Sequence, residues 1–149
     1  MDNSVKIYII FGIVILVTGV ITYLLLHKKR NCFDPDRMEG LEFEEYCACL
    51  LEGAGFYDVE VTAKSGDYGV DILASKDMVT YAIQCKIYSE PVGIKAVQEV
   101  YTGRDYYDRM VGAVLTNQYF TRAAINSAQK LKILLWDRDY LQQLIEQNK

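Results

Sequence analysis

The sequence predicts one α/β domain whose mixed sheet is flanked by helices on both faces, preceded by one transmembrane helix. Three observations lead to this prediction. Short β-rich runs and amphipathic helical runs alternate from residue 41 to the end, the first three β-rich runs follow one another closely, and residues 7–26 contain no charged side chain. Crossing a bilayer takes about 20 of the 149 residues. The remainder suffices for one ordinary domain.

Residues 7–26 read IYIIFGIVILVTGVITYLLL, an uncharged run of the length that a transmembrane helix needs. The run exceeds the apolar core of a signal peptide, and no small-x-small cleavage site precedes the charges at its end, which favours a retained anchor. The sequence HKKR follows the run, whereas only Lys6 precedes it. Basic flanks tend to stay in the cytoplasm. We therefore expect a single-pass protein of the cell membrane that contacts the lipid bilayer through residues 7–26, with a basic juxtamembrane linker at 27–37 and a cytoplasmic domain at 38–149.

Apolar spacing assigns the elements of the cytoplasmic part in order. Apolar residues at every third or fourth position predict helices, and short β-rich runs bounded by Gly, Ser and Asp predict strands. Pro91 opens one helix where its missing N–H costs nothing, and Asp137 caps the last helix. Because a helix joins the third and fourth strands, we expect that pair to be parallel. The expected order is a helix at 41–54, strands at 59–62, 70–74 and 79–88, a helix from 91, a strand at 111–116, a helix at 121–131, a strand at 133–136 and a terminal helix.

The charge of this part limits its partners. From residue 31 onward the chain has 12 Lys and Arg and 19 Asp and Glu, a formal charge of −7. This excess weighs against strong non-specific DNA binding, which needs several cationic contacts to phosphates. Cys32, Cys47, Cys49 and Cys85 have the spacing of neither a zinc site nor a disulfide framework, which fits a reducing compartment.

Polar residues interrupt one face of the strand predicted at 79–88. By alternation Gln84 and Lys86 share a face, and a turn of two or four residues after the preceding strand puts Asp71 on that face as well. The carboxylate of Asp71 and the backbone carbonyl of Cys85 are oxygen ligands suited to Mg²⁺. Lys86 could orient or help deprotonate water and neutralise charge on a phosphate. The alternative is an exposed strand face with no chemical role, the commoner position of such residues.

Two runs, SGDYGVDILAS at 65–75 and YAIQCKIYSEPVGIKAVQEV at 81–100, resemble the Mrr-like branch of the PD-(D/E)xK nuclease superfamily. The stretches GLEFEEYCACLLEGAGF, from Gly40, and AVLTNQYFTRAAINSA, from Ala113, also match that pattern. The resemblance covers nearly all of the chain after Met38. It implies a three-layer, restriction-endonuclease-like fold and a nuclease of a restriction system that cleaves DNA with Mg²⁺ or Mn²⁺.

Carried over position by position, the resemblance makes Asp71 the metal-binding aspartate and Lys86 the catalytic lysine. Gln84 takes the place of the acidic residue of the D/E-x-K element, so we expect one weakly held metal ion and slow cleavage. Glu44 would be a supporting acid near the metal, although a glutamate in a first helical turn also complements the helix dipole. Gln98 and Thr116 match positions that such domains often hold near the site.

The sequence therefore favours a membrane-anchored, metal-dependent endodeoxyribonuclease. The acidic charge motivates an alternative, a catalytically weak or inactive membrane-tethered module that binds DNA or protein. Mrr-like proteins often carry a separate DNA-reading domain, for which residues 38–149 leave no room. A homodimer and an unidentified protein partner stay open, and an RNA substrate ranks lower because no RNA-binding signature is visible.

Overall fold

The computed structural model describes residues 16–19, 35–62 and 68–149 of the chain. The chain divides into two compact units, with the boundary between Phe33 and Asp34. Residues 16–19 are helical, whereas the rest of the predicted membrane span at 7–26 and most of the predicted linker lie outside the described residues. Within the described ranges, no helix has the length and apolar character needed to cross a membrane.

The second unit is built on a mixed sheet of five strands in the order β1-β2-β3-β4-β5, counted over the described residues. The first three strands are antiparallel neighbours, and the β3–β4 and β4–β5 pairs are parallel. The parallel pairing predicted for the third and fourth strands is therefore confirmed. The elements are η1 (Pro35–Arg37), α2 (Gly40–Gly53), β1 (Tyr57–Val61), β2 (Ile72–Lys76), β3 (Val79–Lys86), α3 (Ile94–Tyr106), β4 (Val111–Thr116), α4 (Arg122–Leu131), β5 (Ile133–Trp136) and α5 (Arg138–Gln147).

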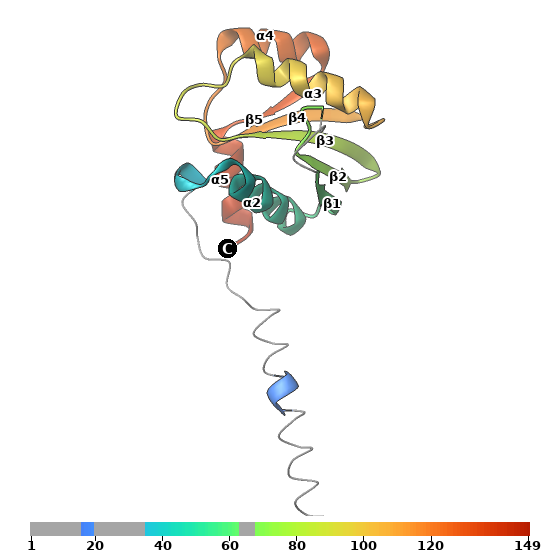
Figure 1. Ribbon diagram of the computed structural model, residues 1–149, viewed down its shortest axis with the longest axis vertical. Coiled ribbons are helices and arrows are strands. Elements are labelled where there is room, and N and C mark those ends of the chain that lie inside the picture. Colours follow the sequence, from blue (N-terminus) through green and yellow to red (C-terminus); the bar gives the residue numbers. More distant parts are fainter. Residues whose placement is uncertain (1–15, 20–34, 63–67) are drawn as a thin grey trace, which may run out of the picture. The chain divides into compact units, whose positions relative to one another are not determined.

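Helices cover the sheet on both faces, with α2 and α5 on one side and α3 and α4 on the other (Figure 1). Alternation along β3 explains the layers, because Ile83 and Cys85 pack in the core beneath α2. The opposite core lies beneath α3 and α4 and contains Val97, Val100 and Val114. Burying one such side chain stabilises the fold by about 1.5–3 kcal/mol. The predicted three-layer α/β architecture is therefore confirmed for the second unit.

A two-residue turn joins β2 to β3. Asp77 and Met78 both have positive φ angles, 51° and 64°, as the type I′ turn of a tight hairpin requires. The register runs from Lys76 opposite Val79 to Ile72 opposite Ile83. Of the two turn lengths that the sequence allowed, the shorter one is observed. Continued by one residue, this register brings Asp71 to the position opposite Gln84.

The connection from β3 to α3 differs from the prediction. The helix begins at Ile94 and not at Pro91, because the backbone of Val92 is paired with another segment. Its N–H donates to the carbonyl of Tyr119 at 2.9 Å, and its carbonyl accepts from Thr121 at 3.0 Å. A backbone paired in this way with a distant segment cannot also make the hydrogen bonds of a first helical turn.

Candidate active site

The predicted site lies where β3 ends beneath α3. Lys86, the last residue of β3, has its ammonium 3.2 Å from Oε2 of Glu99 on α3. Gln84, two residues earlier on the same face, donates from Nε2 to that same oxygen at 3.1 Å. One carboxylate oxygen therefore binds both polar residues that the sequence placed on this strand face.

Glu99 carries a negative charge at neutral pH. Burial raises the pKa of its carboxyl group, but the hydrogen bond and charge of Lys86, the amide of Gln84 and the charge of Lys95 together hold that pKa below its usual value. Lys95 lies one helical turn earlier, 3.6 Å from Oε1, and is largely exposed. Lys86 is the more buried of the two lysines that face this carboxylate.

Gln84 is almost fully buried, with 3% of its surface exposed. Its Nε2 is bound to Glu99, while Oε1 has no hydrogen-bond partner among the described residues. An unpaired buried amide oxygen costs about 1–3 kcal/mol. The strand face therefore presents one oxygen acceptor whose hydrogen-bonding capacity is unused.

Asp71 sits directly before β2 and is hydrogen-bonded to β3. Its N–H donates to the carbonyl of Ile83 at 2.9 Å, and its Oδ2 accepts from the N–H of Cys85 at 2.7 Å. Cys85 is the residue between Gln84 and Lys86. The structure therefore brings the predicted residues Asp71, Gln84 and Lys86 together around the backbone of Cys85.

Glu44 approaches Cys85 from the α2 layer. The thiol of Cys85 hydrogen-bonds to that of Cys47, and this bond, burial and the nearby charges of Asp71 and Glu44 raise its pKa well above the ordinary value. The thiol is therefore neutral. Glu44 lies within electrostatic range of Cys85, but on α2, in the layer opposite to the helix that carries Glu99.

The other two predicted positions behave differently. Thr116 is fully buried and lies beside Lys86 in the parallel register, with its hydroxyl accepting from the N–H of Gln118. Gln98 is exposed, and only its backbone carbonyl has a described contact, with Thr102. The helix residue that reaches the strand is its neighbour Glu99, which the sequence analysis did not select. The sequence feature that could have identified Glu99 is its pairing with Lys95, four residues earlier on the helix that follows the Q-x-K strand.

A pocket of about 80 Å³ opens beside this cluster at the N-terminus of α3. Two lysine ammonium groups and the first turn of a helix are features that bind phosphate. Within the described ranges, no group of three or more His, Cys, Asp or Glu side chains is placed to hold a metal ion. The pocket is lined by Lys86, Tyr88, Val92, Gly93, Lys95, Ala96 and Glu99.

Comparisons with solved structures show that the fold is shared with restriction endonucleases. The modification-dependent restriction endonuclease AspBHI is 19% identical (TM-score 0.53), and 86% of this chain covers 34% of that one. The restriction endonuclease MspJI, solved in complex with a 27-mer oligonucleotide, is 16% identical (TM-score 0.54), with 88% of this chain covering 31% of that one. A protein of unknown function, AF1548, is 24% identical (TM-score 0.59), with 69% of this chain covering 63% of that one.

The chain thus spans about a third of each of the two restriction endonucleases and under two thirds of AF1548. No curated protein sequence matches it. The family model of the Mrr catalytic domain, described as a restriction endonuclease, matches residues 35–145. That range contains Asp71, Gln84, Lys86 and Glu99, and the chain therefore belongs to the Mrr restriction endonuclease family.

Proposed function

We propose that this protein is a metal-dependent endodeoxyribonuclease that hydrolyses DNA phosphodiester bonds. The observation that carries the proposal is the convergence of Lys86 and Gln84 on one oxygen of Glu99, with Asp71 bound to the backbone between them. In a domain of the restriction endonuclease family, this cluster of acidic, amide and ammonium groups supports a role in phosphodiester hydrolysis.

The oxygen donors around Cys85 fit a divalent cation. The carboxylate of Asp71, the backbone carbonyl of Cys85 and the unpaired Oε1 of Gln84 belong to the ligand class that Mg²⁺ prefers, and water completes such sites. The bond from Nε2 to Glu99 turns the amide so that Oε1 is the atom left without a partner. Bound there, Mg²⁺ or Mn²⁺ would polarise the phosphate and lower the pKa of a water molecule. Because Asp71 is the only carboxylate among these three donors, we expect weak binding of one ion.

The protein's own groups account for the rest of the chemistry. The ammonium of Lys86 is placed to orient the attacking water and to offset the charge that develops on the phosphate. Glu99 holds that ammonium at the end of β3, so it is fixed before substrate arrives. Lys95 and the first turn of α3 line the neighbouring pocket and would bind a phosphate oxygen of the DNA strand.

Residues 7–26 would anchor this nuclease to the cytoplasmic face of the cell membrane. The support is their uncharged composition and the HKKR sequence that follows them. Retention of the full chain in carbonate-washed membranes, with protease digesting the domain only after the cells are opened, is the expected result. Release of the chain by carbonate would contradict the anchor.

The acidic charge supports a second candidate, a catalytically weak membrane-tethered module that binds DNA or a protein partner. Residues 31–149 carry a net charge of −7, and Lys86 already faces a carboxylate. The salt dependence of DNA binding without metal distinguishes the DNA-binding form of this module from the protein-binding form. A module that reads DNA should bind with a steep salt dependence, whereas a module that binds protein should show no DNA binding and no cleavage.

The test of the nuclease is cleavage of supercoiled plasmid by the full chain in detergent, with Mg²⁺, Mn²⁺ or EDTA. We expect nicked and linear DNA with either metal, none with EDTA, and none with Asp71→Asn. Asp108→Asn is the matched control, because Asp108 is exposed and asparagine tolerates its positive φ of 51°. Intact plasmid with both metals, or wild-type cleavage by Asp71→Asn, would overturn the proposal.

A further inference from the structure

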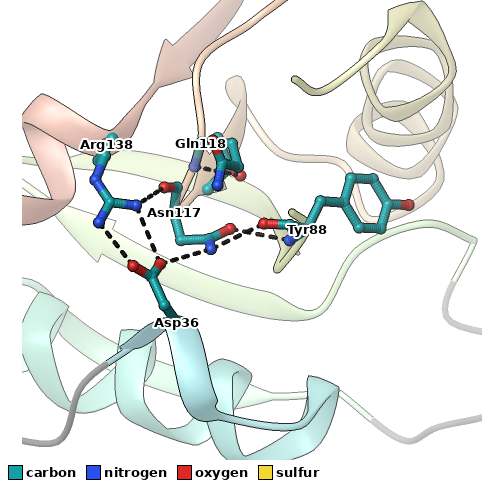
Figure 2. Close-up of polar contacts among 6 residues, drawn as sticks. Asp36, Tyr88, Asn117, Gln118 and Arg138 are labelled. Carbon is teal, nitrogen blue, oxygen red and sulfur yellow. Dashed lines mark hydrogen bonds and ion pairs between the residues drawn. The ribbon is translucent and has the colours of Figure 1, made fainter. Parts of the chain in front are cut away.

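Asn117 clamps the backbone just beyond Lys86. It follows β4 directly and is 2% exposed. Its Oδ1 accepts from the N–H of Tyr88 at 2.9 Å, and its Nδ2 donates to the carbonyl of Tyr88 at 3.0 Å, as Figure 2 shows. The side-chain amide therefore pairs with Tyr88 as a neighbouring strand would, and it extends the β3–β4 pairing past its last register pair, Lys86 with Thr116.

The same segment holds the far end of the connection to α3. Val92 lies between Tyr119 and Thr121, bound to the first through its N–H and to the second through its carbonyl. Residues 87–93 join the strand that carries Lys86 to the helix that carries Glu99. Residues 117–121 bind that connection at two points, Tyr88 and Val92, and thereby set how β3 leads into α3.

An ion pair between Asp36 and Arg138, both partly exposed, in turn holds Asn117 from outside the connection. Nδ2 of Asn117 also donates to Oδ1 of Asp36 at 2.9 Å, and the backbone carbonyl of Asn117 accepts from Arg138 at 2.7 Å. Arg138 binds both carboxylate oxygens of Asp36, at 3.0 and 2.7 Å (Figure 2). Both hydrogens of the Asn117 amide and its oxygen are thus bound. Such a bidentate pair adds geometric specificity as well as energy.

We propose that Asn117 is a positioning residue of the active site, which fixes the β3–α3 connection so that Lys86 faces Glu99, with Asp36 and Arg138 fixing Asn117. The inference rests on the proposed nuclease for its catalytic consequence. Asn117 touches neither Lys86 nor Glu99 through any described contact and acts through Tyr88. A displacement of about 1 Å in a catalytic group can lower the rate a hundredfold.

The experiment compares Asn117→Ala with Asn148→Ala in the full chain. Asn148 is a matched control, because its Nδ2 likewise bridges two backbone carbonyls, those of Leu50 and Leu144, between α2 and α5. For Asn117→Ala we expect kcat on DNA to fall about ten- to a hundredfold with KM within about twofold. Amide exchange of peptides covering residues 87–93 should rise about tenfold. Asn148→Ala should leave both kcat on DNA and the amide exchange of residues 87–93 unchanged.

A milder variant covers the case in which Asn117→Ala does not fold. Asp36→Ala removes one support of Asn117 from a partly exposed position, and we expect the same changes at a smaller size, about threefold in kcat. An unchanged kcat in a folded Asn117→Ala protein, or an equal loss in Asn148→Ala, would overturn the inference. If the wild-type chain cuts no DNA, the proposed function fails separately. Crystal structures then decide the inference, since it requires the Lys86–Glu99 contact to be broken in Asn117→Ala and kept in Asn148→Ala.

Discussion

The ammonium of Lys86 and the carboxylate of Glu99 lie 3.2 Å apart, and they come from different layers of the fold. Lys86 ends β3, whereas Glu99 is in the middle of α3. Their contact therefore depends on how α3 packs on the sheet and not on the strand alone.

Replacing Glu99 should weaken the hold on Lys86. Glu99→Gln keeps the size of the side chain but removes the negative charge, and we expect DNA cleavage about ten- to a hundredfold slower with little change in thermal stability. Glu146→Gln, which makes the same change at an exposed position of α5, is the control. Equal cleavage rates of Glu99→Gln and wild type would show that Glu99 does not support the site.

Gln84→Glu tests the proposed cation site without measuring activity. The new carboxylate would stand where Nε2 of Gln84 lies 3.1 Å from Oε2 of Glu99, so two carboxylates would meet in a buried position. We expect a loss of about 2–4 kcal/mol in metal-free buffer. Mg²⁺ should restore much of that stability, giving a larger rise in Tm than in wild type. The same Tm with and without Mg²⁺ would contradict the site.

Gly103→Ala should destabilise the fold, although alanine is normally favoured over glycine in a helix by about 1 kcal/mol. A Cβ at this position of α3 would come within 2.6 Å of the carbonyl oxygen of Tyr68 and would also meet the side chain of Val70. This segment leads into Asp71. We expect the free energy of unfolding, measured with urea, to fall by about 1–3 kcal/mol. A gain in stability would show that residues 68–70 move aside at little cost.

Asp36 should make stability depend on pH in the acid range. Hydrogen bonds from Arg138 and Asn117 and the charge of Arg138 hold the pKa of its carboxyl below the usual value, against a smaller opposing effect of burial. A lowered folded-state pKa stabilises the fold above the unfolded value, near 3.9, and this contribution is lost as the pH falls through the folded pKa.

We therefore expect Asp36→Asn to lower the free energy of unfolding at pH 7 by about 1 kcal/mol or less, since solvent screens a side chain that is 39% exposed. The difference from wild type should shrink below about pH 4. Urea unfolding at several pH values measures it. A difference that stays constant from pH 7 to pH 3 would exclude the charge of Asp36 as its cause.

The order of elements and the shared strand face were predictable because they follow from local patterns. Alternation on the strand placed Gln84 with Lys86, and the short loop limited Asp71 to one face whichever turn formed. The turn length itself was open, since neither Asp77 nor Met78 is the glycine that usually indicates a type I′ turn. The start of α3 was wrong, because Pro91 suits a first helical turn but Val92 pairs with a segment almost 30 residues later.

Glu99 and Asn117 were missed for a related reason. Their roles come from contacts between layers, which no sequence period reports. On the helix, Gln98 matched the family pattern, and only the observed orientation of α3 shows that its neighbour faces the strand. Asparagine is an ordinary residue type in a loop, so the sequence gives no sign that Asn117 is special. Its burial depends on Tyr88, Asp36 and Arg138 meeting around it.

The most direct measurement of the central claim is the single-turnover rate of DNA cleavage in Mg²⁺ by Lys86→Ala and Lys95→Ala. Both variants remove an ammonium that faces Glu99, at 3.2 and 3.6 Å, so they change the charge of the same site equally. We expect Lys86→Ala to lower the rate about a thousandfold or more, and Lys95→Ala to lower it less than about tenfold. Equal rates in the two variants, or a wild-type rate in Lys86→Ala, would contradict the account.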